Sequence, residues 1–172
     1  QKLLTFDSGL KLVSAANGVL GESIKSAQEI EGALSSAPAL PIAFPNSGLG
    51  QQLAQVAQII AVRDSLGMNR QIFFAGMGGF DNHDFLLTQH TQQLAQVNAA
   101  VDAFYAWLVQ AGVQNDVTLF TASDFGRTLT SNGDGTDHGW GAHHFVTGGA
   151  VRGKDIYGRY PIIGVNTDDD VG

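Results

Sequence analysis

The stretch of sequence that decides the fold runs from Val117 to Phe145 and reads VTLFTASDFGRTLTSNGDGTDHGWGAHHF. It begins with an apolar, β-branched run, Val117 to Ala122, which predicts a buried strand. Polar residues follow this run at once, and three of the five histidines of the chain lie in the segment. Carboxylate, guanidinium and imidazole groups directly after a buried strand are typical of the ligand-binding edge of an α/β sheet.

A second strand and a long helix precede this stretch. Gln71 to Met77, QIFFAGM, is a short apolar run that predicts another buried strand. The apolar residues between the two strands recur every three or four positions and predict a helix; they are Leu87, Leu94, Val97, Val101, Phe104 and Leu108. A strand, a helix and a strand with short connections form a βαβ unit with parallel strands. The sequence therefore predicts an α/β class fold, with three α/β/α layers and a mostly parallel sheet.

The earlier part of the chain is less regular. Helical spacing of apolar residues predicts a helix over Leu49–Leu66, and a weaker pattern predicts one over Ser23–Leu34. Three prolines between them mark a connection without regular structure, Pro38, Pro41 and Pro45. We therefore expect an N-terminal helical or irregular segment with its proline-rich connection over residues 1–48, and an α/β portion over residues 49–172.

The composition of the chain limits the partners and the metal ligands that are possible. The chain has 172 residues, of which 44% are hydrophobic, and this is enough for a domain with its own core. A net charge of −7 without a basic stripe argues against nucleic acid as a partner. No apolar run approaches the roughly 20 residues that span a bilayer. Because the chain has no cysteine, any metal must be held by Asp, Glu and His, which suits zinc, manganese, magnesium or calcium.

The first polar cluster follows the strand predicted over Gln71–Met77. Asp81 and His83 are separated by one residue in a glycine-flanked loop, and together they could bind one divalent metal. In the alternative interpretation, Asn82 or Asp84 caps the following helix and His83 is a solvated loop residue. The second carboxylate expected at the neighbouring strand end favours the metal site, with Asp84 assigned to capping.

That second carboxylate is Asp124, which follows the strand predicted over Val117–Ala122. A buried carboxylate in this position must be paired or bound to a metal. One interpretation pairs it with Arg127, three residues further on. In the other, Asp124 is a metal ligand and Arg127 orients a phosphate or sulfate oxygen with its planar fork of donors.

The remaining histidines follow a glycine-rich loop. Neutral imidazoles are common zinc ligands, and a ligating histidine needs an outer acceptor, which Asp137 or Asp134 could supply. His143 and His144 are adjacent, and adjacent residues on an extended chain face opposite ways, so at most one of them is expected at the site. His138 is therefore the favoured ligand.

Two segments resemble a known family. They are MGGFDNHD, which begins at Met77, and LFTASDFGRTLTSNGDGTDHGWGAHHFVTGGAVRGKDIYG, which begins at Leu119. Both are similar to the bacterial DUF1501 family, which is grouped with the alkaline phosphatase and sulfatase superfamily. The resemblance covers the chain from Leu49 onward and implies an alkaline-phosphatase-like α/β/α fold with one or two divalent metals, commonly zinc. It also implies a periplasmic or secreted location.

Carried over residue by residue, the resemblance implies that the metal ligands are Asp81, His83, Asp124 and His138. The sequence departs from the superfamily pattern at Phe125, where a histidine would be expected, so one metal site lacks a ligand. Nothing in residues 1–48 resembles the early strand that carries the nucleophile of the superfamily. We therefore expect the chain to be a fragment of a longer protein.

Two hypotheses follow for function. The first is a metal-dependent hydrolase of phosphate or sulfate esters, with a small anionic ester as its partner and Arg127 orienting the anion. The second is a non-catalytic exported protein that retains the fold for binding or assembly. Phe125 favours this second hypothesis, because it stands where the superfamily has a histidine ligand. A third hypothesis, a nucleotide-binding oxidoreductase, rests only on the glycines of Gly76–Asp81, where the third glycine of a dinucleotide loop is missing.

Overall fold

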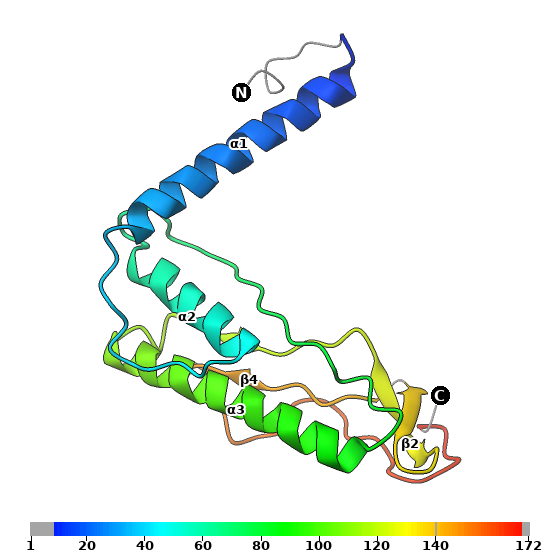
Figure 1. Ribbon diagram of the computed structural model, residues 1–172. Helices are drawn as coiled ribbons and strands as arrows, with labels where there is room; N and C mark the ends of the chain where they lie inside the picture. The colour runs from blue at the N-terminus through cyan, green and yellow to red at the C-terminus, as the bar shows by residue number, and fades with distance from the viewer. Residues whose placement is uncertain (1–8, 140, 170–172) are drawn as a thin grey trace. The chain divides into compact units, whose positions relative to one another are not determined.

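The computed structural model describes residues 9–139 and 141–169 (Figure 1). The chain divides into two compact units. The first unit consists of Gln1–Leu40 and Gln55–Phe73, and the second consists of Pro41–Ala54 and Phe74–Gly172. All residues of the candidate site described below lie in the second unit. No helix in the described part of the chain is both long enough and apolar enough to cross a bilayer.

The first unit contains helix α1, Lys11–Leu34, which has no buried residue. This confirms the helix predicted over Ser23–Leu34, and the helix begins twelve residues earlier than its weak spacing indicated. Its end is defined by hydroxyl groups, because Ser35 Oγ donates to the carbonyl of Gly32 at 2.7 Å and Ser36 Oγ donates to the carbonyl of Ala33 at 3.0 Å. Pro38 follows soon after, where the lack of an N–H group prevents further helix.

Helix α2, Gly48–Ala61, confirms the helix predicted from Leu49, although turns replace its expected last residues. Its first residues belong to the second unit, where the side chain of Gln52 supports the extended stretch that follows. Gln52 Nε2 donates to the Gly76 carbonyl at 2.8 Å, and the Gly76 N–H donates to Gln52 Oε1 at 2.9 Å. This amide therefore satisfies both backbone groups of Gly76, as a neighbouring strand would do.

Helix α3, Leu86–Gln110, is the main helix of the second unit. It confirms the helix that was predicted from the apolar residues between Leu87 and Leu108. Its second half carries the buried residues Ala100, Phe104, Trp107 and Leu108. Its first half is different, because Leu87 is 84% exposed. The chain leaves the helix at Gly112, whose φ of 71° is one that glycine adopts without strain.

The expected cap of α3 is wrong. Phe85 occupies the N-cap position with a left-handed φ of 52°, and no side chain caps the helix there, so Asp84 does not act as the cap. The first helical N–H group is satisfied from elsewhere in the chain, because Leu86 N–H donates to the carbonyl of Asp134 at 3.0 Å. This bond joins the start of α3 to a turn nearly fifty residues away.

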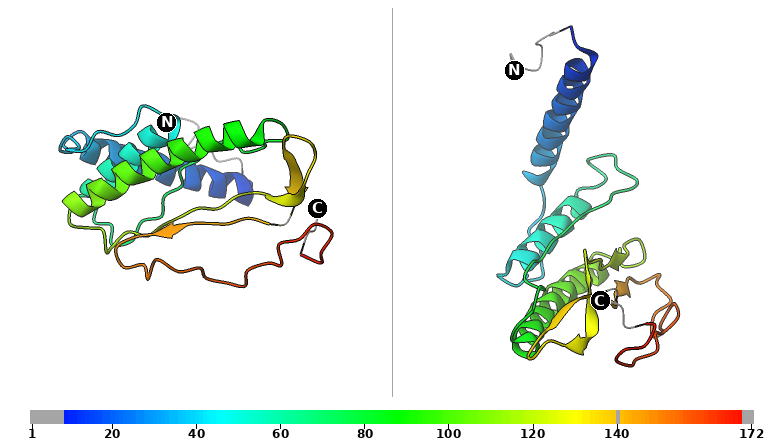
Figure 2. Two further views of the ribbon diagram at one scale, coloured as in Figure 1. Left: turned by 90° about the horizontal axis from the view of Figure 1, so that it is seen from below. Right: turned by 90° about the vertical axis from the view of Figure 1, so that its right-hand side faces the viewer.

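That turn belongs to a β-hairpin. Strand β2, Gly126–Ser131, pairs antiparallel with β3, Thr136–Gly139, with Arg127 opposite His138 in the register. The two short strands β1, Leu119–Phe120, and β4, Val146–Thr147, form a second antiparallel pair. Figure 2 shows the β2–β3 hairpin beside the first turns of α3 from two directions.

The expected parallel sheet therefore stays a prediction. Both strand pairs in the described ranges are antiparallel, and residues 71–77 are extended without a ladder partner. The strand predicted over Val117–Ala122 is present only as β1. Its partner β4 follows it in the sequence, whereas the β-α-β interpretation required a partner that precedes it.

Candidate metal site

The site lies where the loop before α3 meets the β2–β3 hairpin. Gly135, at the turn of the hairpin, is buried against this loop, and a Cβ atom there would collide with the carbonyl of His83. Only glycine allows such close backbone contact. The loop is fixed from its other side by Asn82, which is 2% exposed and donates to the Gly79 carbonyl at 3.0 Å and to Gln89 Oε1 at 2.8 Å. Asp81 and His83, on either side of Asn82, are thereby held toward the hairpin.

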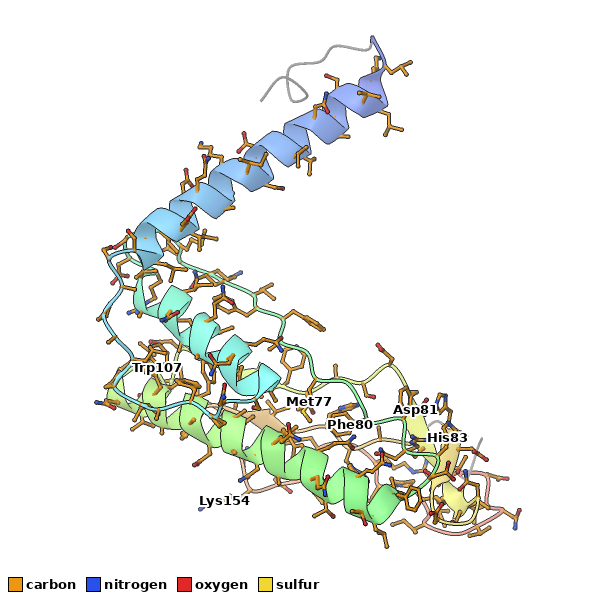
Figure 3. All side chains as sticks on the ribbon, in the orientation of Figure 1. Met77, Phe80, Asp81, His83, Trp107 and Lys154 are labelled. Atoms are coloured by element: carbon orange, nitrogen blue, oxygen red, sulfur yellow. The ribbon has the colours of Figure 1, made fainter. Side chains whose placement is uncertain are left out.

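One carboxylate oxygen is the centre of the cluster. Asp81 Oδ1 lies 2.7 Å from His138 Nε2 and 2.9 Å from His83 Nε2. It also lies 3.1 Å from Arg127 Nη2. Asp81 and His83 come from the loop, whereas Arg127 and His138 face each other across the hairpin, so the pairing of β2 with β3 brings the cluster together. Figure 3 shows Asp81 and His83 side by side next to the hairpin.

Arg127 connects the two parts of the site. Its Nη1 donates to the Thr136 carbonyl at 2.7 Å, within the hairpin. Its Nη2 donates to the Phe80 carbonyl at 2.9 Å and to Asp81 Oδ1 at 3.1 Å, both in the loop. The side chain is only 20% exposed. The planar fork of donors therefore holds the Asp81 loop against the hairpin.

The two histidines are supported in different ways. The ring of His138 stacks on Phe125, with centroids 4.3 Å apart and an angle of 14° between the planes. His83 instead places Nδ1 3.1 Å from Asp137 Oδ1, and the same oxygen accepts a hydrogen bond from Asn132 Nδ2 at 3.1 Å. A carboxylate beside the outer nitrogen of a histidine is a common support for a metal ligand.

The electrostatics of the cluster favour the ionised form of Asp81. The hydrogen bond from His138 is the largest effect and lowers the pKa of the Asp81 carboxyl. The positive charges of His83, His138 and Arg127 lower this pKa further, and together these effects exceed the opposing effect of desolvation. An ionised carboxylate is the form that binds a metal ion.

The structure brings together four of the five residues predicted for the site. Asp81, His83, Arg127 and His138 share the cluster, and Asp124 lies outside it. The prediction that Asp124 is buried is wrong: Asp124 is exposed, because β1 ends at Phe120 and residues 122–124 all lie on the surface. The ion pair considered between Asp124 and Arg127 is replaced by the pair of Arg127 with Asp81.

The other histidines lie elsewhere. His144 Nδ1 lies 3.4 Å from Thr121 Oγ1, and the ring of His143 lies 5.7 Å from that of Tyr160. His90, on α3, is exposed, and its ring lies edge-on to that of Phe80 with the ring centroids 6.0 Å apart.

Sequence reasoning did not assign roles in the site to Phe125 and Asn132. Phe125 is two residues before Arg127, and Asn132 stands in the turn of the hairpin. Their positions become informative only when the register of β2 and β3 is known, because that register brings Phe125 to His138 and Asn132 to Asp137.

Three residues of the site have the composition of a metal centre. Ligand atoms of Asp81, His83 and His138 all lie within 4.8 Å of one another. Two imidazole nitrogens and one carboxylate oxygen form a set of protein ligands found in catalytic zinc sites, where a further position stays open to solvent or substrate. The site thus belongs to the class of solvent-accessible Asp/His clusters that can hold a divalent cation.

Comparison with known proteins identifies the family. A family model described as "Protein of unknown function (DUF1501)" matches residues 18–171. The chain belongs to this family, as the resemblance of its two segments indicated. Neither the curated proteins nor the solved structures contain a match.

Proposed function

We propose that Asp81, His83 and His138 bind a divalent metal ion, and that the protein uses it to hydrolyse phosphate or sulfate esters. The observation that supports this most directly is the convergence of two imidazole nitrogens and one carboxylate oxygen within 4.8 Å. The three side chains are partly exposed, so both a metal and a small anionic ester can reach them from solvent.

The ligand types favour zinc over the other candidates. Zinc binds imidazole nitrogen and carboxylate oxygen readily, and manganese accepts the same ligands. Magnesium prefers an all-oxygen shell and is the weaker candidate, because two of the three ligand atoms here are nitrogens. When bound, the ion would polarise the ester and stabilise the charge that develops on the leaving oxygen.

Arg127 has two roles in this proposal. Its bonds to the Phe80 carbonyl and to Asp81 hold the carboxylate ligand in place. Its guanidinium group also lies beside the proposed ligands, with Nη2 3.1 Å from Asp81 Oδ1, so Arg127 remains the residue proposed to orient an ester anion.

The first test is elemental analysis of the purified chain, together with titration of Zn²⁺ into metal-free protein. We expect near-stoichiometric binding in the wild type and its loss in Asp81→Ala, His83→Ala and His138→Ala. His90→Ala is the matched control, because His90 is an exposed histidine outside the cluster. A wild-type chain that takes up no metal, or an Asp81→Ala chain that still binds it with full affinity, would show the proposal to be wrong.

A second candidate function is metal binding without catalysis, in an exported protein of binding or assembly. Two observations favour it: Asp124 lies outside the cluster, and an aromatic ring at Phe125 stacks on His138 where a further ligand could have stood. The two functions differ in one measurement. Hydrolysis of chromogenic phosphate and sulfate monoesters by the zinc-loaded chain, lost in His138→Ala, supports the hydrolase, whereas stoichiometric zinc without hydrolysis supports the binding protein.

A further inference from the structure

His83 lies between two carboxylates. Its Nε2 is 2.9 Å from Asp81 Oδ1, and its Nδ1 is 3.1 Å from Asp137 Oδ1. A neutral imidazole carries a single N–H group and can donate to only one of these oxygens. The tautomer of His83 therefore depends on which oxygen still has room for a donor.

The oxygen of Asp81 is the more crowded of the two. It already has His138 Nε2 at 2.7 Å and Arg127 Nη2 at 3.1 Å. A carboxylate oxygen offers about two lone-pair sites, so these two donors use both. Asp137 Oδ1 has one other donor among the described residues, Asn132 Nδ2 at 3.1 Å, and keeps a site for His83. The proton of His83 thus belongs on Nδ1, facing Asp137.

We infer that Asp137 is a positioning residue that fixes His83 as the Nδ1–H tautomer and presents the lone pair of Nε2 as a metal ligand. This inference rests on the metal site proposed above. In this tautomer Nε2 of His83 and Oδ1 of Asp81, which are 2.9 Å apart, are both acceptors, and a divalent cation bound by both atoms would offset their repulsion.

The inference separates the two histidines. His138 is supported by the stacked ring of Phe125, so its position does not depend on Asp137. His83 has Asp137 on its outer nitrogen, and Asn132 holds Asp137 in turn. Loss of Asp137 should therefore affect one ligand of the site and leave the other unchanged.

The experiment compares Asp137→Ala with Asp134→Ala. Both remove an exposed aspartate from the same hairpin, and the Asp137 side chain is 64% exposed, so neither change should prevent folding. Nitrogen-15 NMR of the metal-free chain, at a pH where imidazoles are neutral, reports the tautomer of His83. Competition with a chromophoric chelator measures the affinity for Zn²⁺ alone.

We expect the Nδ1–H tautomer of His83 in the wild type and in Asp134→Ala. In Asp137→Ala the Nδ1–H group of His83 loses its acceptor, so the Nδ1–H tautomer should no longer predominate. The Zn²⁺ affinity of Asp137→Ala should fall by about 10- to 100-fold, and that of Asp134→Ala should stay unchanged. The tautomer of His138 should be the same in all three proteins.

Several results would overturn the inference. They are an Nε2–H tautomer in the wild type, a tautomer that does not respond to Asp137→Ala, and a Zn²⁺ affinity that Asp137→Ala leaves unchanged. If the wild type binds no Zn²⁺, the proposed function fails, and the tautomer in the metal-free chain still decides whether Asp137 controls His83. If Asp137→Ala does not fold, Asp137→Leu replaces it, because leucine is similar in size and has no acceptor, and full Zn²⁺ affinity in that variant would also be contrary to the inference.

Discussion

Arg127 and Asp81 are joined across 46 residues of chain by a hydrogen bond of 3.1 Å from Nη2 to Oδ1. The same guanidinium group donates to the backbone carbonyls of Phe80 and Thr136. One side chain thus satisfies acceptors on both the loop and the hairpin. This makes Arg127 a structural part of the cluster as well as the proposed anion-binding group.

Replacement of Arg127 should therefore affect stability as well as any activity. In Arg127→Met, two carbonyls and a carboxylate lose their donor, and the free energy of unfolding should fall by about 1–3 kcal/mol. Arg127→Lys should recover only part of this loss, since an ammonium group cannot reproduce the fork of the guanidinium. Urea denaturation of metal-free protein measures the change. Arg159→Met, at an exposed arginine, is the control, and equal stability of the two Met variants would contradict the prediction.

Gly135 should be intolerant of any side chain. A Cβ atom there would collide with the carbonyl of His83, so Gly135→Ala must push the loop away from the hairpin. We expect a loss of stability of about 1–3 kcal/mol and weaker Zn²⁺ binding, because Asp81 and His83 move relative to His138. Gly78→Ala is the matched control, since a Cβ atom at that position meets nothing within 4 Å. Unchanged Zn²⁺ affinity in Gly135→Ala would mean that this contact does not position the ligands.

The packing of the core in the second unit can be tested with two leucines of the same helix. Leu108 is 2% exposed on α3, whereas Leu87, on the same helix, is 84% exposed. Leu108→Ala should lower the free energy of unfolding by about 2–5 kcal/mol, and Leu87→Ala should change it by less than about 0.5 kcal/mol. Chemical denaturation of both variants gives the comparison. A similar loss in both would show that the first half of α3 is packed in solution.

The contrast between these two leucines also shows what the sequence could predict. The spacing of apolar residues identified α3 correctly, because helical periodicity is a local property of the chain. It could not identify which half of the helix is covered, since burial depends on distant segments. The prediction of the N-cap was wrong for the same reason, because the Leu86 N–H group donates to the carbonyl of Asp134, which is distant in the sequence.

The candidate site could be predicted in residue type and only partly in geometry. Carboxylate and imidazole groups after an apolar run indicated Asp81 and His83, and the glycine-rich loop indicated His138. The structure brings these three residues together. Asp124 was selected on the expectation of burial after a strand, and the chain is exposed there. The support of His83 by Asp137 and of His138 by Phe125 depends on the hairpin register, which no local pattern reveals.

The free energy of unfolding should depend on pH through the ionisation of Asp81. Its pKa is lowered in the folded protein, first by the hydrogen bond from His138 and then by the neighbouring positive charges. The folded state therefore binds the proton more weakly than the unfolded state, and the ionised carboxylate stabilises the fold above the ordinary pKa of an aspartate. This stabilisation is lost as the pH falls through the lowered pKa of the folded state.

In metal-free wild-type protein, urea denaturation at a series of pH values should thus show a fall in stability below the ordinary pKa of aspartate. Asp81→Asn should be less stable than the wild type above that pKa, and the difference between the two should shrink as the pH falls. Asp84→Asn, at an exposed neighbour in the same loop, should follow the wild-type profile. A pH profile of Asp81→Asn that runs parallel to that of the wild type would mean that the contacts with His138, His83 and Arg127 do not stabilise the ionised carboxylate in solution.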